Sequence, residues 1–108
     1  MGINLDKFGY QKAAELKDLE DNKSANVELG PLPLLLHRRG NEVLATGVYC
    51  AHQDVRLNPN NCSGDTILCT AHGYRMNIRT GACLNEDDLF LTTYPTLIEN
   101  GEVWVKLR

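Results

Sequence analysis

The paired stretches Cys50-Ala51-His52 and Cys69-Thr70-Ala71-His72 place a cysteine next to a histidine twice in this 108-residue chain. Sixteen residues separate His52 from Cys69. A thiolate is a soft, strongly donating ligand suited to iron–sulfur clusters, and a neutral imidazole also binds iron well. Each pair is short enough to lie in one tight loop, so two loops could clamp one metal centre. The two pairs are therefore the first candidates for metal or redox chemistry.

The pattern Cys-x-His followed by Cys-x-x-His at about this distance resembles the ligand pattern of the Rieske 2Fe-2S family, in which two thiolates hold one iron and two imidazoles hold the other. The resemblance runs through most of the chain. It implies one 2Fe-2S cluster per chain, with Cys50 and Cys69 on the buried iron and His52 and His72 on the outer iron. Neutral imidazoles leave such a cluster less negative, which raises its reduction potential above that of all-cysteine ferredoxins.

The residues after the second pair follow the second-loop layout of the same family. His72-Gly73 is followed by Tyr74-Arg75-Met76-Asn77 and then by Arg79-Thr80-Gly81. The glycine after His72 allows close backbone approach, so that amides can point at cluster sulfurs. The Asn and the Thr-Gly pair predict the turn that follows the loop. Leu57 stands where the family often places an apolar residue that shields the cluster.

Two departures from the high-potential members of the family bear on the potential. Those members join an extra cysteine in each loop as a disulfide, whereas Val55 and Ala71 occupy these positions here. They also place a Ser and a Tyr that donate hydrogen bonds to sulfur, where this chain has Tyr74 and Met76. Fewer donors leave the reduced cluster less stabilised. We therefore expect a potential toward the lower end of the range of roughly −150 to +300 mV.

Composition and charge restrict the class of protein. The length suits a single domain, and the net charge of −3 gives no basic field for nucleic acid. The longest strongly apolar run, residues 32–36, is too short to cross a bilayer. Residues 1–7 lack the charged-then-apolar layout of a secretion signal. We therefore expect a cytoplasmic protein, in which four cysteines suggest metal or redox chemistry before a disulfide scaffold.

Short segments between frequent glycines and prolines predict an all-β domain. Two of these segments flank Arg39-Gly40-Asn41 and predict a hairpin. The last segment alternates apolar and polar residues and predicts a strand, with Trp104 on a partly covered face. Only residues 11–19 have a helical look, for which we expect a single turn or an irregular stretch. The expected strands are residues 32–38, 42–46, 66–68, 74–78, 89–93 and 102–107, the last two being closing strands joined through a turn at Glu99-Asn100-Gly101.

Other residues that could carry chemistry have ordinary interpretations. Cys62 and Cys83 match no ligand position and are expected to be free thiols, with a mutual disulfide as the alternative. His37 is expected to be a surface or half-buried strand residue rather than a ligand. Tyr49 and Trp104 are expected to be core aromatics.

Charged residues near the loops leave two interpretations open. Glu86-Asp87-Asp88 could help to dock a basic reductase surface, but a solvated loop is the simpler interpretation. The arginines Arg56, Arg75 and Arg79 could frame a docking face, and solvation alone would explain them equally well.

The resemblance implies an all-β Rieske (ISP-like) fold, with stacked antiparallel sheets and a small two-loop cluster-binding subdomain. We expect residues 1–108 to form a single Rieske 2Fe-2S domain with that subdomain at about 47–81. The family role is one-electron transfer as a stand-alone ferredoxin, from a flavin-dependent reductase to a terminal oxygenase or hydroxylase. We expect a monomer that catalyses nothing alone, because a mononuclear iron site needs two histidines and a carboxylate, and only His37 remains for it. No Gly-x-Gly-x-x-Gly indicates a nucleotide cofactor.

Two other functions remain open at this stage. The chain could be the small Rieske subunit of a larger redox enzyme, such as a nitrite reductase. Such subunits share the fold but often lack the ligands, which are present here. A structural zinc-binding interaction module is the more distant alternative, because two Cys and two His can also hold zinc.

Overall fold

The computed structural model describes residues 9–50, 55–70 and 73–107, and within these ranges almost all regular structure is β. Two short 3₁₀ turns, η2 (Leu16–Asp18) and η3 (Pro59–Asn61), interrupt the strands. No helix in these ranges has the length and apolar character needed to cross a membrane. The strands are β1 (Tyr10–Glu15), β2 (Ser24–Leu29), β3 (Leu32–Arg39), β4 (Glu42–Thr46), β5 (Cys62–Ser63), β6 (Thr66–Cys69), β7 (Tyr74–Asn77), β8 (Thr93–Tyr94), β9 (Thr96–Glu99) and β10 (Glu102–Lys106).

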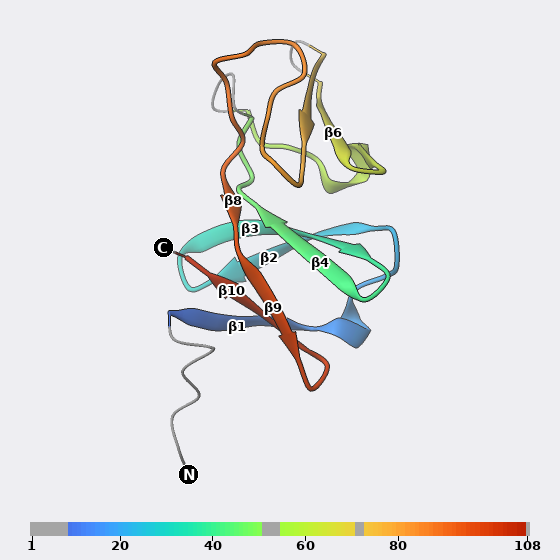
Figure 1. Cartoon of the computed structure of the whole chain (residues 1–108), viewed down its shortest axis with the longest axis vertical. Helices are drawn as coiled ribbons and strands as arrows, with labels where there is room; N and C mark the ends of the chain where they lie inside the picture. Colours follow the sequence, from blue (N-terminus) through green and yellow to red (C-terminus); the bar gives the residue numbers. More distant parts are fainter. Residues whose placement is uncertain (1–8, 51–54, 71–72, 108) are drawn as a thin grey trace.

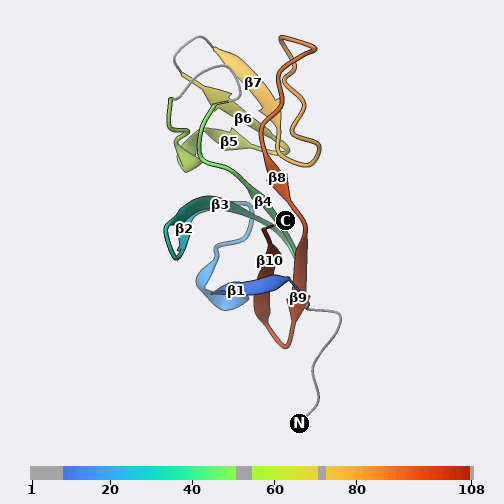
Figure 2. The same cartoon turned by 90° about the vertical axis from the view of Figure 1, so that its left-hand side faces the viewer.

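The strands form three antiparallel sheets with the orders β1-β10-β9, β2-β3-β4-β8 and β5-β6-β7. The first two sheets pack on each other and form the lower part of the molecule, here called the base (Figure 1). The third sheet lies at the opposite end of the molecule. This sheet and the other described residues between Gly47 and Leu91 are here called the cap. Figure 2 shows the same division from the side. The expected fold, an all-β arrangement of stacked antiparallel sheets, is confirmed.

The base encloses a core between its two sheets. Val103 and Val105 of β10 are fully buried, while the residues between and around them are half-buried. This period of two matches a strand with one face in the core, and Trp104 lies on the half-buried second face as expected. The other fully or nearly fully buried side chains of this core are Leu19, Leu34, Leu36, Val43 and Ala45. Each buried Leu or Val contributes roughly 1.5–3 kcal/mol to folding.

Strand β3 is buried on both faces, which explains its continuous run of apolar residues. Leu34 and Leu36 belong to the base core. Leu35 points the other way and belongs to the core of the cap. The base and the cap therefore share β3 as a common wall.

The predicted hairpin across Arg39-Gly40-Asn41 is confirmed. Strands β3 and β4 pair from Leu35↔Thr46 to Arg39↔Glu42. Gly40 has φ +65°, a conformation that glycine adopts without steric cost. The predicted strands at 66–68 and 74–78 correspond to β6 and β7, which pair with each other.

The single turn expected within residues 11–19 is present as η2, but most of this stretch belongs to β1, which pairs with β10 along Tyr10↔Lys106 to Glu15↔Glu102. One expected strand was wrong. The strand expected at 89–93 is absent from that stretch of described residues except for the start of β8 at Thr93. The strand that precedes the turn at 99–101 is β9, which pairs with β10.

Two side-chain expectations were also wrong. Tyr49 is not a core aromatic, since 51% of its surface is exposed. His37 is neither a surface nor a half-buried residue, since it is fully buried. A histidine between three leucines and two arginines gives no sequence signal for the polar partners that allow its burial.

The partners of His37 form a chain of hydrogen bonds across the sheet. Its Nδ1 lies 2.6 Å from Ser24 Oγ, and its Nε2 lies 3.0 Å from Thr46 Oγ1. The Thr46 hydroxyl donates to the carbonyl oxygen of Gly47 at 3.0 Å, so its oxygen is left to accept from Nε2–H. Nδ1 then accepts from the Ser24 hydroxyl. A neutral imidazole thus ties β2, β3 and β4 to the point where the chain enters the cap.

This arrangement makes stability depend on pH. Burial, with a smaller contribution from the Arg39 charge, lowers the pKa of His37 from 6.5 to about 4. Between pH 6.5 and about pH 4, His37 binds a proton in the unfolded chain but not in the folded protein. The histidine therefore reduces the free energy of unfolding as pH falls from about 6.5 to 4, by about 3 kcal/mol in total.

Urea unfolding of wild type and His37→Gln at pH 7 and pH 4.5 should show a smaller pH-dependent loss of unfolding free energy for the variant. Equal losses would contradict a buried neutral His37.

Candidate metal centre

Cys50 and Cys69 are brought into one buried core at the cap end of the molecule. Their side chains are 6% and 1% exposed. Both belong to the cap core together with Leu57, Ile67 and Met76. Cys50 comes from the segment that continues β4, and Cys69 is the last residue of β6. Two distant parts of the sequence thus place their cysteines in the same apolar environment.

The loop that starts at Cys50 is closed by backbone pairing. The amide of Cys50 donates to the carbonyl of Val55 at 2.9 Å, and Tyr49 pairs with Arg56 in an antiparallel bridge. The amide of Leu57 donates to the carbonyl of Val48 at 2.7 Å. These bonds hold the two ends of the first loop side by side, as a tight ligand loop requires.

The second loop is the tip of the β6–β7 hairpin. Cys69 pairs with Tyr74 across the hairpin. The amide of Gly73 donates to the carbonyl of Cys69 at 3.0 Å. Gly73 has φ +71°, which a residue with a side chain rarely adopts. The expected need for glycine directly after the second Cys/His pair therefore has a backbone reason.

His52 and His72 lie outside the described residues, as does Ala71. The assignment of His52 and His72 as ligands of the outer iron remains a proposal. Within the described ranges, no three side chains of the metal-binding types gather into another site. Two buried cysteines in one core, each at the start of a hydrogen-bonded loop, fit a cluster that needs two thiolates on its inner iron.

The family model of the Rieske [2Fe-2S] domain matches residues 9–95. The chain belongs to this family. The ferredoxin component of biphenyl 2,3-dioxygenase from Rhodococcus jostii is 31% identical over 97 residues, which cover 84% of this chain and 86% of the relative. Ferredoxin CarAc from Metapseudomonas resinovorans is 31% identical over 98 residues, which cover 89% and 92%. The cofactor implied by this membership is a 2Fe-2S cluster.

Solved Rieske structures have the same fold. A complex of reduced oxygenase and oxidised ferredoxin in carbazole 1,9a-dioxygenase includes a chain that matches with a TM-score of 0.77 at 27% identity, over 91% of this chain and 93% of that one. A ferredoxin from Sphingomonas yanoikuyae B1 matches with a TM-score of 0.77 at 25% identity, over 91% and 98%.

The wall behind the Rieske site is apolar and offers no side-chain donor from Met76. Met76 is fully buried, and a thioether can only accept weakly. Leu57, for which a shielding role is expected, is also buried in this core. Such a lining excludes water from the inner side of the site.

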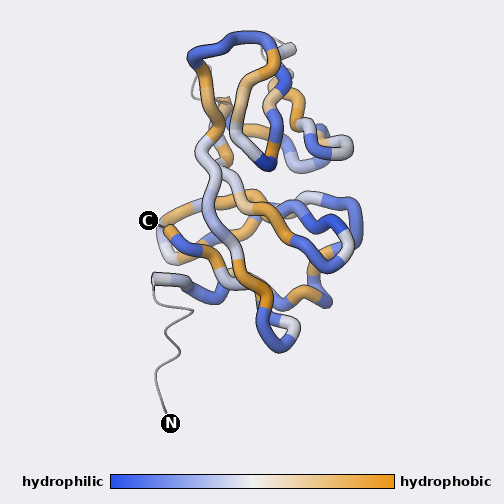
Figure 3. The backbone as a smooth tube through the Cα atoms, viewed as in Figure 1, coloured by the Kyte–Doolittle hydropathy of each residue, from blue (hydrophilic) through white to orange (hydrophobic). Residues whose placement is uncertain are grey.

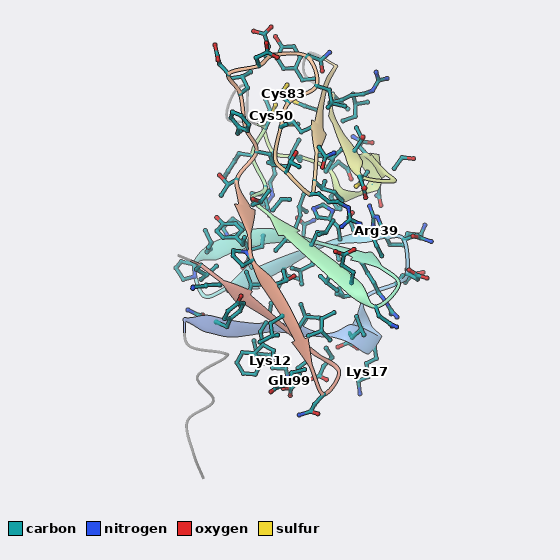
Figure 4. The ribbon with its side chains drawn as sticks, in the orientation of Figure 1. Lys12, Lys17, Arg39, Cys50, Cys83 and Glu99 are labelled. Carbon is teal, nitrogen blue, oxygen red and sulfur yellow. The ribbon has the colours of Figure 1, made fainter. Side chains whose placement is uncertain are left out.

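The two other cysteines are free thiols, as expected. Cys62 is half-buried and lies 3.2 Å from Nη2 of Arg39. Cys83 is buried in the same core as Cys50 and pairs with Met76 in an isolated bridge. Figure 4 places Cys50 and Cys83 together at the cap end. Sequence reasoning did not connect Cys83 with this core, because no motif marks it.

A third segment, residues 82–91, completes the Rieske cap beside the two ligand loops. The amide of Leu84 donates to Arg75 O at 2.7 Å, and that of Leu91 donates to Gly81 O at 2.6 Å. The sequence-based boundary at about residue 81 rests on the two ligand loops alone. Long-range backbone bonds of this kind leave no local sequence signal.

Arginines join the Rieske cap to the base. Arg79 forms ion pairs with Glu42 of the β3–β4 hairpin at 2.9 Å and with Asp65 of the cap at 3.0 Å. The hydrogen bond from Arg79, with its charge, lowers the pKa of the Glu42 carboxyl. Arg39 donates to the carbonyl of Gly64 at 3.0 Å. Arg79 thus has a structural partner on each side of the junction, so a docking role is unnecessary to explain it.

The contact between Gly81 and Leu91 should control the integrity of the cap. Gly81 has φ +81°, and a Cβ there would lie 2.2 Å from Leu91 O. Gly40 has a similar φ of +65° but open space around its Cβ position. We expect Gly40→Ala to cost about 1–2 kcal/mol from backbone strain alone. Gly81→Ala should lower the free energy of unfolding at least twice as much, as measured by urea unfolding. It should also reduce the iron content, as measured by iron analysis. Equal effects of the two variants would contradict this contact.

Proposed function

We propose that this chain is a one-electron carrier whose 2Fe-2S cluster is held by Cys50 and Cys69 on one iron and by His52 and His72 on the other. The observation that carries the proposal is the burial of both cysteines in one core, each at the start of a hydrogen-bonded loop. Bound there, the cluster accepts and releases one electron.

The residues around the site support this function through burial. Leu57, Ile67 and Met76 keep water from the two cysteines. A dry environment, and a buried Met76 thioether that donates no hydrogen bond, leave the added negative charge of the reduced state less stabilised. We assign the imidazoles of His52 and His72 to the outer iron from the ligand pattern of the family, and they would offer a bound cluster a route by which an electron leaves.

The partners that we propose are a flavin-dependent reductase and a terminal oxygenase or hydroxylase. Curated relatives are named as ferredoxin components of dioxygenase systems, and one similar solved chain belongs to an oxygenase–ferredoxin complex. The chain would then be a component of an oxidoreductase system rather than an enzyme by itself. In support, the remaining histidine, His37, is buried in the base on Ser24 and Thr46 and is not available for a mononuclear iron. The cytoplasmic location and monomeric state stay predictions from the sequence.

A small subunit of a nitrite reductase is the second candidate. A putative nitrite reductase small subunit matches with a TM-score of 0.78 but only 17% identity, so the likeness concerns the fold alone. The intact set of two Cys/His pairs favours the electron carrier. Stable co-purification with a large catalytic subunit would favour the second candidate.

The ligand assignment predicts how cysteine variants differ. Cys69→Ser should lose the cluster, because a buried inner-iron thiolate is removed. Cys62→Ser should keep about two irons per chain and the EPR signal of the dithionite-reduced protein. Iron and sulfide analysis on the same samples gives the comparison. A colourless wild-type protein that contains zinc and cannot be reconstituted would refute the electron-carrier function.

The lining predicts a low potential. We expect a midpoint toward the lower end of the Rieske range of roughly −150 to +300 mV. Because the Met76 thioether donates no hydrogen bond, Met76→Leu should leave the midpoint unchanged. A redox titration monitored by visible absorbance measures both. A wild-type midpoint above about +100 mV on that scale would contradict this account.

A further inference from the structure

The exposed large apolar side chains of the described residues all lie in the cap. They are Tyr49, Leu84 and Phe90, which are 51%, 59% and 62% exposed. Isolated exposed apolar residues are common on protein surfaces, but several in one region mark a contact site. The described part of the base, although it contains more strands, has none. The apolar surface is therefore concentrated at the end that carries Cys50 and Cys69.

Backbone pairing brings the segment that leads to Tyr49 beside the segment that follows Phe90. Strands β4 and β8 pair at Ala45↔Tyr94 and Thr46↔Thr93, and the amide of Gly47 donates to Thr92 O at 2.9 Å. Tyr49, two residues beyond Gly47, lines one recess with Thr92 and Tyr94, while its own backbone bridge goes to Arg56.

The two ends of the loop between Leu84 and Phe90 are held together by backbone contacts. Ala82 bridges to Phe90, and the amide of Cys83 donates to Leu89 O at 3.1 Å. Leu84 and Phe90 thus stand at the two ends of one loop. Figure 3 shows this loop as a hydrophilic crest with hydrophobic stretches on both sides.

A recess lies next to Tyr49. It has a volume of about 150 Å³ and is lined mainly by apolar side chains, among them Pro33, Val48, Tyr49 and Tyr94. Thr92, two residues after Phe90, also lines this recess, so the recess lies beside the segment that ends the loop. The recess is large enough for one apolar side chain of another protein.

The crest of the loop carries concentrated negative charge. Glu86, Asp87 and Asp88 are all exposed and together carry three negative charges, as many as the net charge of the whole chain. No lysine or arginine occurs in the sequence between Arg79 and Lys106. Arg79 is itself paired with Glu42 and Asp65. The exposed Arg75, whose backbone bonds to Leu84 and to the Asn85 side chain, offsets part of this charge. The exposed Arg56, which bridges to Tyr49, is a second cation near the surface.

We propose that residues 84–90 together with Tyr49 form a docking surface for a redox partner protein that presents lysines or arginines around an apolar depression. The acidic crest steers and orients the partner, and Tyr49, Leu84 and Phe90 provide the dry contact. Cys83, at the start of this segment, shares a core with Cys50 and Cys69, so a partner bound here lies at the cluster end. The proposal rests on the electron-carrier function.

Ferric cytochrome c is a suitable probe, because lysines surround its exposed haem edge. In stopped-flow mixing, the reduced 2Fe-2S cluster loses one electron and the ferric haem gains it. At low ionic strength we expect E86Q/D87N/D88N to lower the second-order rate constant about tenfold and to flatten its salt dependence. The matched control D18N/E20Q/E28Q makes the same change in net charge at exposed positions of the base and should change the rate less than twofold.

The apolar contact has a separate readout. Phe90→Ser and Leu84→Ser should weaken binding to immobilised cytochrome c at least fivefold at high salt. Iron content and the EPR signal should stay unchanged, since both side chains are mainly exposed. A control triple variant that acts like the loop variant, or loop variants that act like wild type, would overturn the docking proposal while leaving the carrier function intact. Failure of the wild type to hold a reducible cluster would instead refute the carrier function itself.

Discussion

The structure depends on the double burial of strand β3. Leu34 and Leu36 point into the base core, while Leu35 points into the core that holds Cys50 and Cys69. One strand is therefore a wall of both cores, and the position of the cysteines is fixed by the same packing that stabilises the base. A change on either face of β3 would be felt on the other, because interiors are close-packed and transmit small displacements.

The junction between base and cap combines this apolar wall with polar links that differ in character. His37 provides a buried, neutral chain of hydrogen bonds that ends at Gly47, where the chain enters the cap. Arg79 provides exposed ion pairs, which contribute little individually in water. The buried links fix the geometry, whereas the exposed ion pairs add contacts between the two parts at little gain in stability.

The two buried cysteines of the site were easier to predict from the sequence than the surrounding strands. The two Cys/His pairs and Gly73 carry a local pattern, and the hairpin around Gly40 has a turn signal. Strand β1 was expected to be a single turn or an irregular stretch, because Ala13 and Ala14 are adjacent and its apolar residues do not alternate. A register shift between Lys12 and Ala14 explains that spacing. Burial of His37 and exposure of Tyr49 depend on partners far away in the sequence, so no local pattern reveals them.

The turn between β9 and β10 lies at the end of the molecule opposite the cap (Figure 1). Asn100 and Gly101 in this turn are exposed, and both have positive φ. If the protein were attached to a solid surface through this turn, the cap would face away from that surface. This geometry suits immobilisation on an electrode with one uniform orientation, in which current would have to cross the full length of the base. The same turn offers a site for fusion to another protein that keeps the electron-transfer end open.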